Sequence, residues 1–185
     1  GLVVTFGSMS KIKLIKYITR SFIWIIRGTP LMLQIIIVYY GPGLWLDIHI
    51  KNFRFTAVII AFVINYACYF SEIYRGGIES ISKGQYEAAY VLGLSKKMTF
   101  FKIILPQVIK RIIPSITNEV ITLVKDTSLA RVIALSELIR EAEEVMTMQG
   151  ILWPLLYTGV FYLVFSGVLT IIFNKIEKKL DYYKI

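Results

Sequence analysis

Four polar residues in the second half of the chain are spaced so that they share one face of a helix. They follow one another at intervals of four, three and four residues: Ser115, Glu119, Thr122 and Asp126. Such intervals align side chains on one side of an α-helix, in a row about 16 Å long at 1.5 Å per residue. Carboxylates and hydroxyls in a row suit a path for a polar solute. The alternative is that these polar side chains form contacts that hold packed helices together.

A second polar row lies in an earlier apolar segment. Asn65, Tyr69 and Glu72 recur at helical intervals. The neighbouring Tyr66 adds a hydroxyl and an aromatic face, and aromatic faces suit a ligand with a charged amine. Tyrosines are also common at membrane interfaces, which is the alternative interpretation. We predict that the two rows together line a solute-binding site.

Long uncharged runs place both rows in segments that cross a membrane. The chain of 185 residues is 56% hydrophobic, with a mean hydropathy of +0.65. Uncharged runs cover residues 28–46, 55–71 and 145–174, and a spanning helix needs about 20 apolar residues. The sequence therefore predicts an all-α integral membrane protein with one domain. An ionised group at membrane depth costs roughly 2.5–3.5 kcal/mol, so Glu119 and Asp126 must face protein or water.

Charge and hydropathy together predict the order of the elements. Basic clusters mark cytoplasmic segments and the acidic region 137–144 marks an external one. Residues 1–6 resemble the inner end of a spanning helix whose earlier part is missing. The other expected elements are a basic amphipathic helix at 11–27, an outward span at 26–46 interrupted near 41–43, an external loop at 47–54 that exposes His49, an inward span at 55–78, an inner-surface approach at 96–111, a crossing at 112–135, an external helix at 136–150, a span at 151–173 and a cytoplasmic tail at 174–185.

Several function classes are disfavoured. The net charge of +9 is divided among segments, which argues against nucleic acid as a partner. Cys68 stands alone in an apolar run and is expected to be a small buried side chain. The sequence has no nucleophile with a credible histidine, no phosphate-binding glycine loop and no metal-ligand spacing. We therefore expect no catalytic residues, metal or cofactor in this chain, so that energy for transport must come from elsewhere.

A polar insert at residues 82–106 interrupts the apolar segments on the predicted inner side. Ser82 and Gln85 fit a capping box at the start of a helix. Gly93 is suited to end that helix, and Ser95 to cap the next one. The insert is expected to be a helix, a tight turn and a second helix. Its position predicts a docking site for a cytoplasmic partner.

The insert resembles the loop motif of permease subunits of bacterial ABC importers. The match comprises Glu87-Ala88-Ala89, Gly93, Ile103 and Leu105-Pro106 at the family's spacing. In that family the loop holds a coupling helix that sits in a groove of the ATP-hydrolysing subunit. By this resemblance, the residues that couple to the ATPase are Tyr86, Glu87, Ala88, Ala89, Gly93 and Leu94.

A second motif resembles the polar amino acid subfamily of these permeases. It includes Arg27-Gly28-Thr29-Pro30-Leu31 with Gln34. The resemblance implies a type I ABC importer permease fold with a five-helix core, of which the first helix is largely missing here. It also implies a bacterial cell membrane location and a second permease subunit. Two ATPase subunits that bind ATP and Mg and an extracytoplasmic solute-binding protein complete the expected assembly.

The substrate remains open between several alternatives. Glu119 and Asp126 favour a cationic amino acid by charge pairing, whereas Lys125 and Arg75 are suited to meet a carboxylate. Another small solute, such as cystine or an opine, is the first alternative. A passive channel or a structural membrane subunit without an ATPase is the second.

Overall fold

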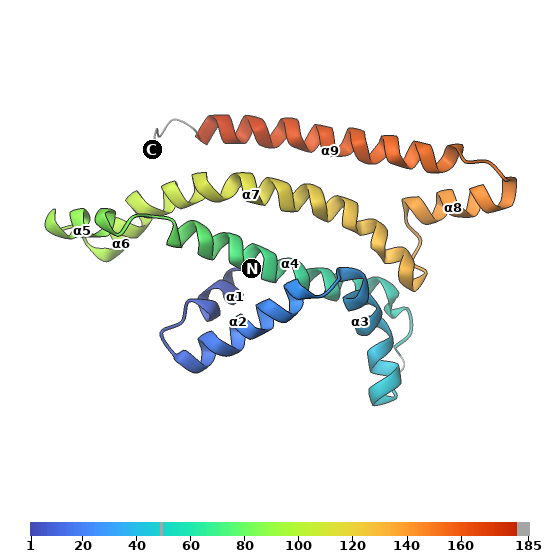
Figure 1. Ribbon diagram of the computed structural model, residues 1–185, viewed down its shortest axis with the longest axis horizontal. Helices are drawn as coiled ribbons and strands as arrows, with labels where there is room; N and C mark the ends of the chain where they lie inside the picture. Colours follow the sequence, from blue (N-terminus) through green and yellow to red (C-terminus); the bar gives the residue numbers. More distant parts are fainter. Residues whose placement is uncertain (49, 181–185) are drawn as a thin grey trace.

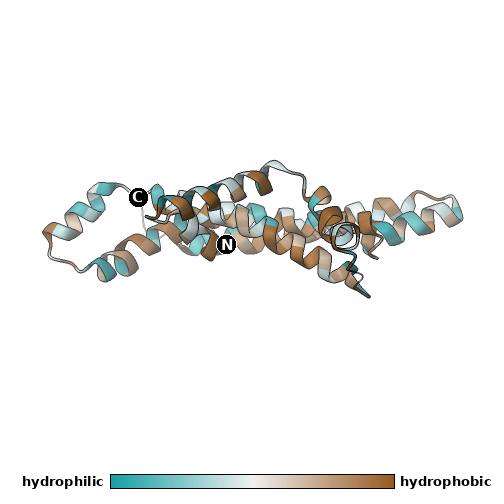
Figure 2. Ribbon diagram, turned by 90° about the horizontal axis from the view of Figure 1, so that it is seen from below, coloured by the Kyte–Doolittle hydropathy of each residue, from teal (hydrophilic) through white to brown (hydrophobic). Residues whose placement is uncertain are grey.

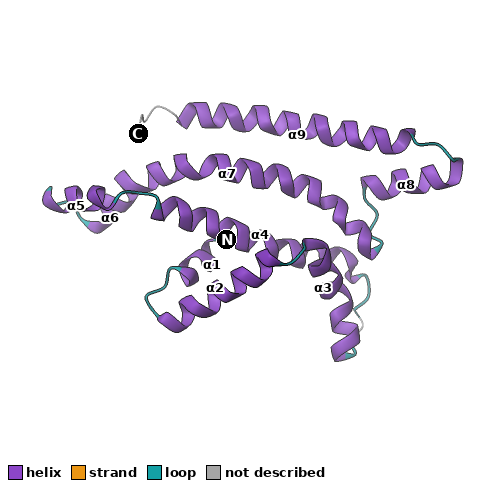
Figure 3. Ribbon diagram, viewed as in Figure 1, coloured by secondary structure: helices purple, strands orange, loops and turns teal. Residues whose placement is uncertain are grey.

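The computed structural model describes residues 1–48 and 50–180, and every element in that part of the chain is helical (Figure 3). The predicted loop position of His49 and the last five residues of the predicted tail lie outside the described residues. The elements are α1 (Leu2–Ser8), α2 (Lys13–Gly28), α3 (Leu31–Leu46), α4 (Phe53–Glu79), α5 (Lys83–Val91), α6 (Lys96–Met98), a π-helical turn η1 (Thr99–Ile104), α7 (Leu105–Asp126), a 3-10 helix η2 (Thr127–Ile133), α8 (Leu138–Gln149) and α9 (Trp153–Leu180).

Three long helices run side by side, with α7 packed between α4 and α9 (Figure 1). The polar helices α5 and α6 lie at one end of the long axis and α8 lies at the other. Hydrophobic residues dominate the middle of the molecule, while both ends contain more hydrophilic ones (Figure 2). This distribution fits a membrane protein whose long axis follows the bilayer normal.

Two helices among the described residues are long and apolar enough to cross a membrane, namely α4 and α9. The helix predicted for residues 55–78 is confirmed by α4, while its inward direction stays a prediction. The predicted span at 151–173 is confirmed as a helix, but α9 continues to Leu180 and includes the first residues of the expected tail. Both α1 and the predicted external helix, which is α8, are also helical.

The predicted span at 26–46 is wrong as a single helix, because α2 and α3 are bent by 105° relative to each other. Thr29 has φ −116° and ψ 144°, and Pro30 precedes the first residue of α3. A residue before proline avoids the helical region, so the chain turns here. The predicted interruption near 41–43 is wrong as well: Pro42 lies inside α3, which continues to Leu46.

The predicted boundary between an approach at 96–111 and a crossing at 112–135 does not coincide with the end of a helix. One helix, α7, runs from Leu105 to Asp126, and the 3-10 helix η2 follows it. Pro106 is the second residue of α7 and directly follows the π-helical turn η1, so it lies where the hydrogen-bond pattern of the helix changes. Pro114 lies within the helix without ending it. Among the described residues, α7 does not meet the length and hydropathy criteria that α4 and α9 meet, so the position of the crossing stays a prediction.

Two buried clusters hold α4 against its neighbours. The first joins α3, α4 and η2 around Ile35, Ala61 and Ile133. The second lies nearer the polar insert, where Ile104, Val108 and Ile112 pack together. These clusters bring the polar face of α4 opposite the polar face of α7. Cys68 is fully buried, as predicted.

Candidate functional site

Two adjoining cavities of about 490 and 500 Å³ lie among α2, α3, α4 and α7. We call the one nearer α5 the inner cavity and the one nearer η2 the outer cavity. Together they are lined by all seven residues of the two predicted rows. Tyr69, Glu72, Ser115 and Glu119 line the inner cavity, and Asn65, Tyr69, Glu119, Thr122 and Asp126 line the outer one. The fold therefore brings the two rows together across one space.

The close approach of α4 to α7 fixes the inner cavity. Gly77 faces Ile112, and a Cβ at Gly77 would lie 2.2 Å from the Ile112 Cγ2 atom. Gly76, one residue earlier, faces open space. Only a residue without a side chain fits at Gly77 with the helices at this separation, so the glycine sets how near the two rows lie.

Glu72 is already neutralised within the chain. Arg75 donates from Nε and Nη2 to its two carboxylate oxygens, over 3.1 and 2.5 Å. Arg75 also donates to Glu79 over 2.6 Å. Such paired, charge-assisted hydrogen bonds are strong. Glu72 therefore contributes shape to the inner cavity more than free negative charge, and Arg75 is not available for a solute carboxylate.

Glu119 and Asp126 are the carboxylates that remain available. Glu119 has no hydrogen bond or ion pair to any residue in the described part of the chain. Asp126 accepts one hydrogen bond, over 2.8 Å, from the hydroxyl of Tyr66. The sequence indicates Tyr66 only as a hydroxyl and an aromatic face beside the second row, not as one of the site residues. Its hydroxyl reaches Asp126 across the helix interface, which no spacing within α4 indicates.

Asn65 has a structural partner as well as a position in the outer cavity. Its Nδ2 donates to Gln34 Oε1 over 3.0 Å. Gln34 in turn donates to the carbonyl oxygens of Ile26 and Thr29, over 2.8 and 3.1 Å. These carbonyls belong to the break between α2 and α3. Backbone groups freed at membrane depth need such partners, so the amides of Asn65 and Gln34 hold the break in place.

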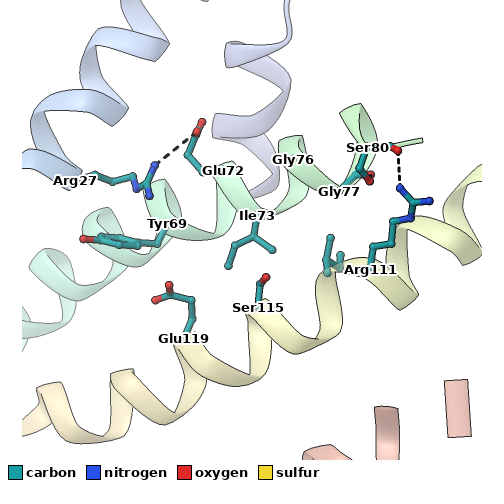
Figure 4. Close-up of a pocket in the computed structure, with 11 residues that line it drawn as sticks. Arg27, Tyr69, Glu72, Ile73, Gly76, Gly77, Ser80, Arg111, Ser115 and Glu119 are labelled. Carbon is teal, nitrogen blue, oxygen red and sulfur yellow. Dashed lines mark hydrogen bonds and ion pairs between the residues drawn. The ribbon is translucent and has the colours of Figure 1, made fainter. Parts of the chain in front are cut away.

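Arg27 is the main lining residue that the predicted rows do not include. It lies near the end of α2, lines both cavities, and places its guanidinium 5.0 Å from the centre of the Tyr69 ring (Figure 4). Its Nη1 is 3.6 Å from Glu72 Oε2. The sequence contains this arginine at the start of the motif 27–31, but its position in the cavity depends on the 105° bend between α2 and α3.

The polar insert has the predicted helix, turn and helix. The Ser82 hydroxyl accepts from the Gly84 N–H, and Ser95 caps α6 at Met98. The capping box is incomplete, because Gln85 exchanges two hydrogen bonds with Gln107 of α7 instead, over 2.8 and 2.6 Å. These bonds connect α5 directly to the helix that contains Glu119.

The turn after α5 is formed by Gly93, which has φ +70°. The Leu94 N–H donates to Ala89 O, and the Gly93 N–H donates to Tyr90 O, both over 3.0 Å. This is the Schellman pattern. Ala89 is 2% exposed, so in this chain its side chain packs inside the insert and does not form part of the exposed surface of α5.

The surface that α5 offers is formed by other residues. Tyr86, Glu87 and Ala88 are exposed, while Leu94 is half-buried. Tyr90 and Val91 are 84% and 83% exposed. A projecting end with so much apolar surface on a polar insert is typical of an interaction site.

Residues 1–182 match the family described as binding-protein-dependent transport system inner membrane component. The chain belongs to this family. It is the membrane permease subunit of a transport system of that kind, with an all-α type I ABC importer permease fold.

Two relatives and one solved structure are similar over most of the chain. The arginine transport system permease protein ArtQ of Bacillus subtilis (strain 168) is 41% identical over 169 residues, which are 87% of this chain and 76% of the relative. The L-cystine transport system permease protein TcyB of the same strain is 35% identical over 185 residues, 99% of this chain and 78% of the relative. A crystal structure of an amino acid ABC transporter with histidines has a TM-score of 0.86 and 33% identity, and the match covers 96% of this chain and 82% of that one.

Proposed function

We propose that this permease moves a polar amino acid with a cationic group through the two cavities. The observation that supports this best is the pair Glu119 and Asp126, whose charges no basic side chain of the described chain neutralises by an ion pair. Both line the outer cavity with the aromatic ring of Tyr69. A carboxylate pair beside an aromatic face attracts an ammonium or guanidinium group. The similarity to an arginine permease agrees with this substrate class.

The competing interpretation from the sequence is less well supported. It assigned a solute carboxylate to Lys125 or Arg75. Lys125 is exposed and lines neither cavity, and Arg75 is held by Glu72 and Glu79. The second candidate substrate is cystine, because a cystine permease is among the relatives. Cystine also presents ammonium groups to the same carboxylates.

The energy for uptake would come from separate ATPase subunits that bind ATP and Mg, with a second permease subunit and an extracytoplasmic solute-binding protein completing the assembly in a bacterial inner membrane. The exposed surface of α5 supports this arrangement, because it projects from one end of the molecule. The hydrogen bonds between Gln85 and Gln107 would transmit a movement of α5 to α7. In this proposal the coupling surface comprises Tyr86, Glu87 and Ala88, with Gly93 and Leu94 shaping the turn.

Uptake by the reconstituted transporter tests the substrate assignment. Proteoliposomes that contain the wild-type transporter or its Glu119→Gln or Asp126→Asn variant would be supplied with labelled arginine, lysine, histidine, glutamine or cystine. We expect both variants to lose uptake of cationic amino acids, because each removes a charge that faces the solute. The matched control is Glu144→Gln on α8, which removes a carboxylate far from the cavities. Unchanged uptake of every substrate in both cavity variants would refute the assignment.

The coupling role needs a separate measurement. Glu87→Arg reverses the charge on the exposed face of α5, and Gly93→Trp places a side chain at a positive φ. We expect both variants to reach the membrane but to lose solute-stimulated ATP hydrolysis together with uptake. Lys83→Gln, at the start of the same helix, is the control. Normal stimulated hydrolysis and uptake in both variants would exclude this surface as the coupling site.

A further inference from the structure

We infer that Arg27 is the receptor for the α-carboxylate of the solute, which it binds in place of its loose contact with Glu72. This inference rests on the proposed function, since it assumes an amino acid in the cavities. It adds the residue that would recognise the acidic end of the molecule. The proposed function names only the groups that attract the cationic end.

The hydrogen-bonding capacity of Arg27 is unused. Its nearest charged neighbour is Glu72, with Nη1 and Oε2 3.6 Å apart, which exceeds the roughly 2.7–3.2 Å of an N–H···O hydrogen bond. Arg27 makes no hydrogen bond to any residue that the structure describes. Its side chain is 42% exposed, and Figure 4 shows its guanidinium beside the Tyr69 ring. A guanidinium in this state still has all five N–H donors to offer.

The other arginine that lines the inner cavity and the arginine that pairs with Glu72 already have partners. Arg111 also lines it, but its Nη1 donates to the backbone oxygen of Ser80 over 2.5 Å. Arg75 is held by two carboxylates of its own helix. Arg27 is thus the lining arginine whose planar fork is free for bidentate binding of a carboxylate, a geometry for which arginine is better suited than lysine.

Arg27 lies where it can bind the carboxylate of an amino acid while the cavity carboxylates bind its cationic groups. Arg27 and Glu119 both line the inner and the outer cavity, and so lie at their junction. Asp126 lines only the outer cavity. A solute whose carboxylate lies on Arg27 therefore has its amino group near Glu119, and a cationic side chain extends towards Asp126. The Tyr69 ring below the guanidinium restricts its orientation.

Releasing Glu72 leaves no unpaired charge behind. Glu72 keeps its two hydrogen bonds from Arg75 when Arg27 turns to the solute. Removing one partner of an isolated ion pair would instead strand the other charge. Gln34 fixes the backbone on both sides of Arg27 through Ile26 and Thr29. The backbone can therefore stay in place while the side chain changes partner.

A comparison of amino acids with their amides tests this role. L-arginine and L-argininamide differ in whether the carboxyl group is charged, as do L-glutamine and L-glutaminamide. Dissociation constants would be measured by equilibrium dialysis with the purified transport complex in nanodiscs, without the solute-binding protein. We expect wild-type protein to bind the acid about 10- to 100-fold more tightly than its amide, as for a hydrogen bond to a charged group. Arg27→Gln should bring this ratio close to one by weakening the acid alone.

Two further variants separate this role from a general effect. Arg27→Lys keeps the charge without the fork and should give an intermediate ratio. Arg20→Gln removes the same charge from the same helix, outside both cavities, and should keep the wild-type ratio. A wild-type ratio near one, or a ratio that persists in both Arg27 variants, would overturn the inference and leave the proposed function standing. If wild-type protein bound neither acid, the proposed function and the inference would both fail.

Discussion

Replacing Gly77 by alanine would add a methyl group where α4 and α7 approach most closely. The new carbon would lie 2.2 Å from Ile112 Cγ2 and 3.3 Å from Val108 Cγ1. Non-bonded carbon atoms in van der Waals contact are about 3.5 Å or more apart, so the methyl group and Ile112 must separate by about 1.3 Å. Overpacking of this kind costs about 1–3 kcal/mol.

The adjacent Gly76 provides a matched reference, because a Cβ there meets nothing within 4 Å. Both glycines lie inside α4, so alanine improves helix propensity equally at the two positions, by roughly 0.5–1 kcal/mol. That gain cancels when the two variants are compared. Gly77→Ala should therefore be less stable than Gly76→Ala by about 1–3 kcal/mol.

Thermal unfolding of both variants in the same detergent, followed by tryptophan fluorescence, would measure the difference. At roughly 2–4 °C per kcal/mol for a chain of this size, Gly77→Ala should unfold about 2–12 °C below Gly76→Ala. Adding Ile112→Ala should be less harmful in the Gly77→Ala background than in wild type, since the new methyl group fills part of the space. Equal midpoints for the two single variants, together with strict additivity in the double variant, would refute the close-approach argument.

Three other perturbations follow from single contacts. Tyr66→Phe removes the hydrogen bond to Asp126 and should cost about 1.5–3 kcal/mol of stability; thermal unfolding should show a larger loss than for Tyr69→Phe, whose hydroxyl has no partner in the described chain. Gly93→Ala forces a methyl group into a left-handed conformation at a cost of about 1–2 kcal/mol, and should speed hydrogen exchange at the end of α5 but not in α8. Glu137→Ala removes the carboxylate that caps α8, a loss of about 0.5–2 kcal/mol, and should speed exchange in the first turn of α8 alone.

The two polar rows were predictable because helical spacing is a local property. Once α4 and α7 are helices, Asn65 and Tyr69 must share a face, and so must Glu119 and Asp126. The fold then needs only to turn those faces towards each other. Apolar residues on the remaining faces of α4 achieve this, since they pack into the cluster around Ile35.

The hydrogen-bond and ion-pair partners of these residues are harder to predict from the sequence. The pairing of Glu72 with Arg75 was predictable from their spacing of three, whereas the reach of Tyr66 to Asp126 depends on how two helices align. To predict that Arg27 lines the cavities, one must know both the bend at Pro30 and the register of α2 against α4. Long-range register depends on the sum of many packing contacts, so no local pattern encodes it.

Because α9 is weakly buried, its sequence should tolerate substitution more readily than that of the other long helices. Thr158 is its one buried residue, although α9 packs along α7 and α8. Most of its other side chains are exposed and apolar in this chain, and positions that face lipid accept many different apolar side chains. Drift among descendants should therefore accumulate along this helix, and a library that exchanges leucine, valine and phenylalanine there should yield mostly functional clones.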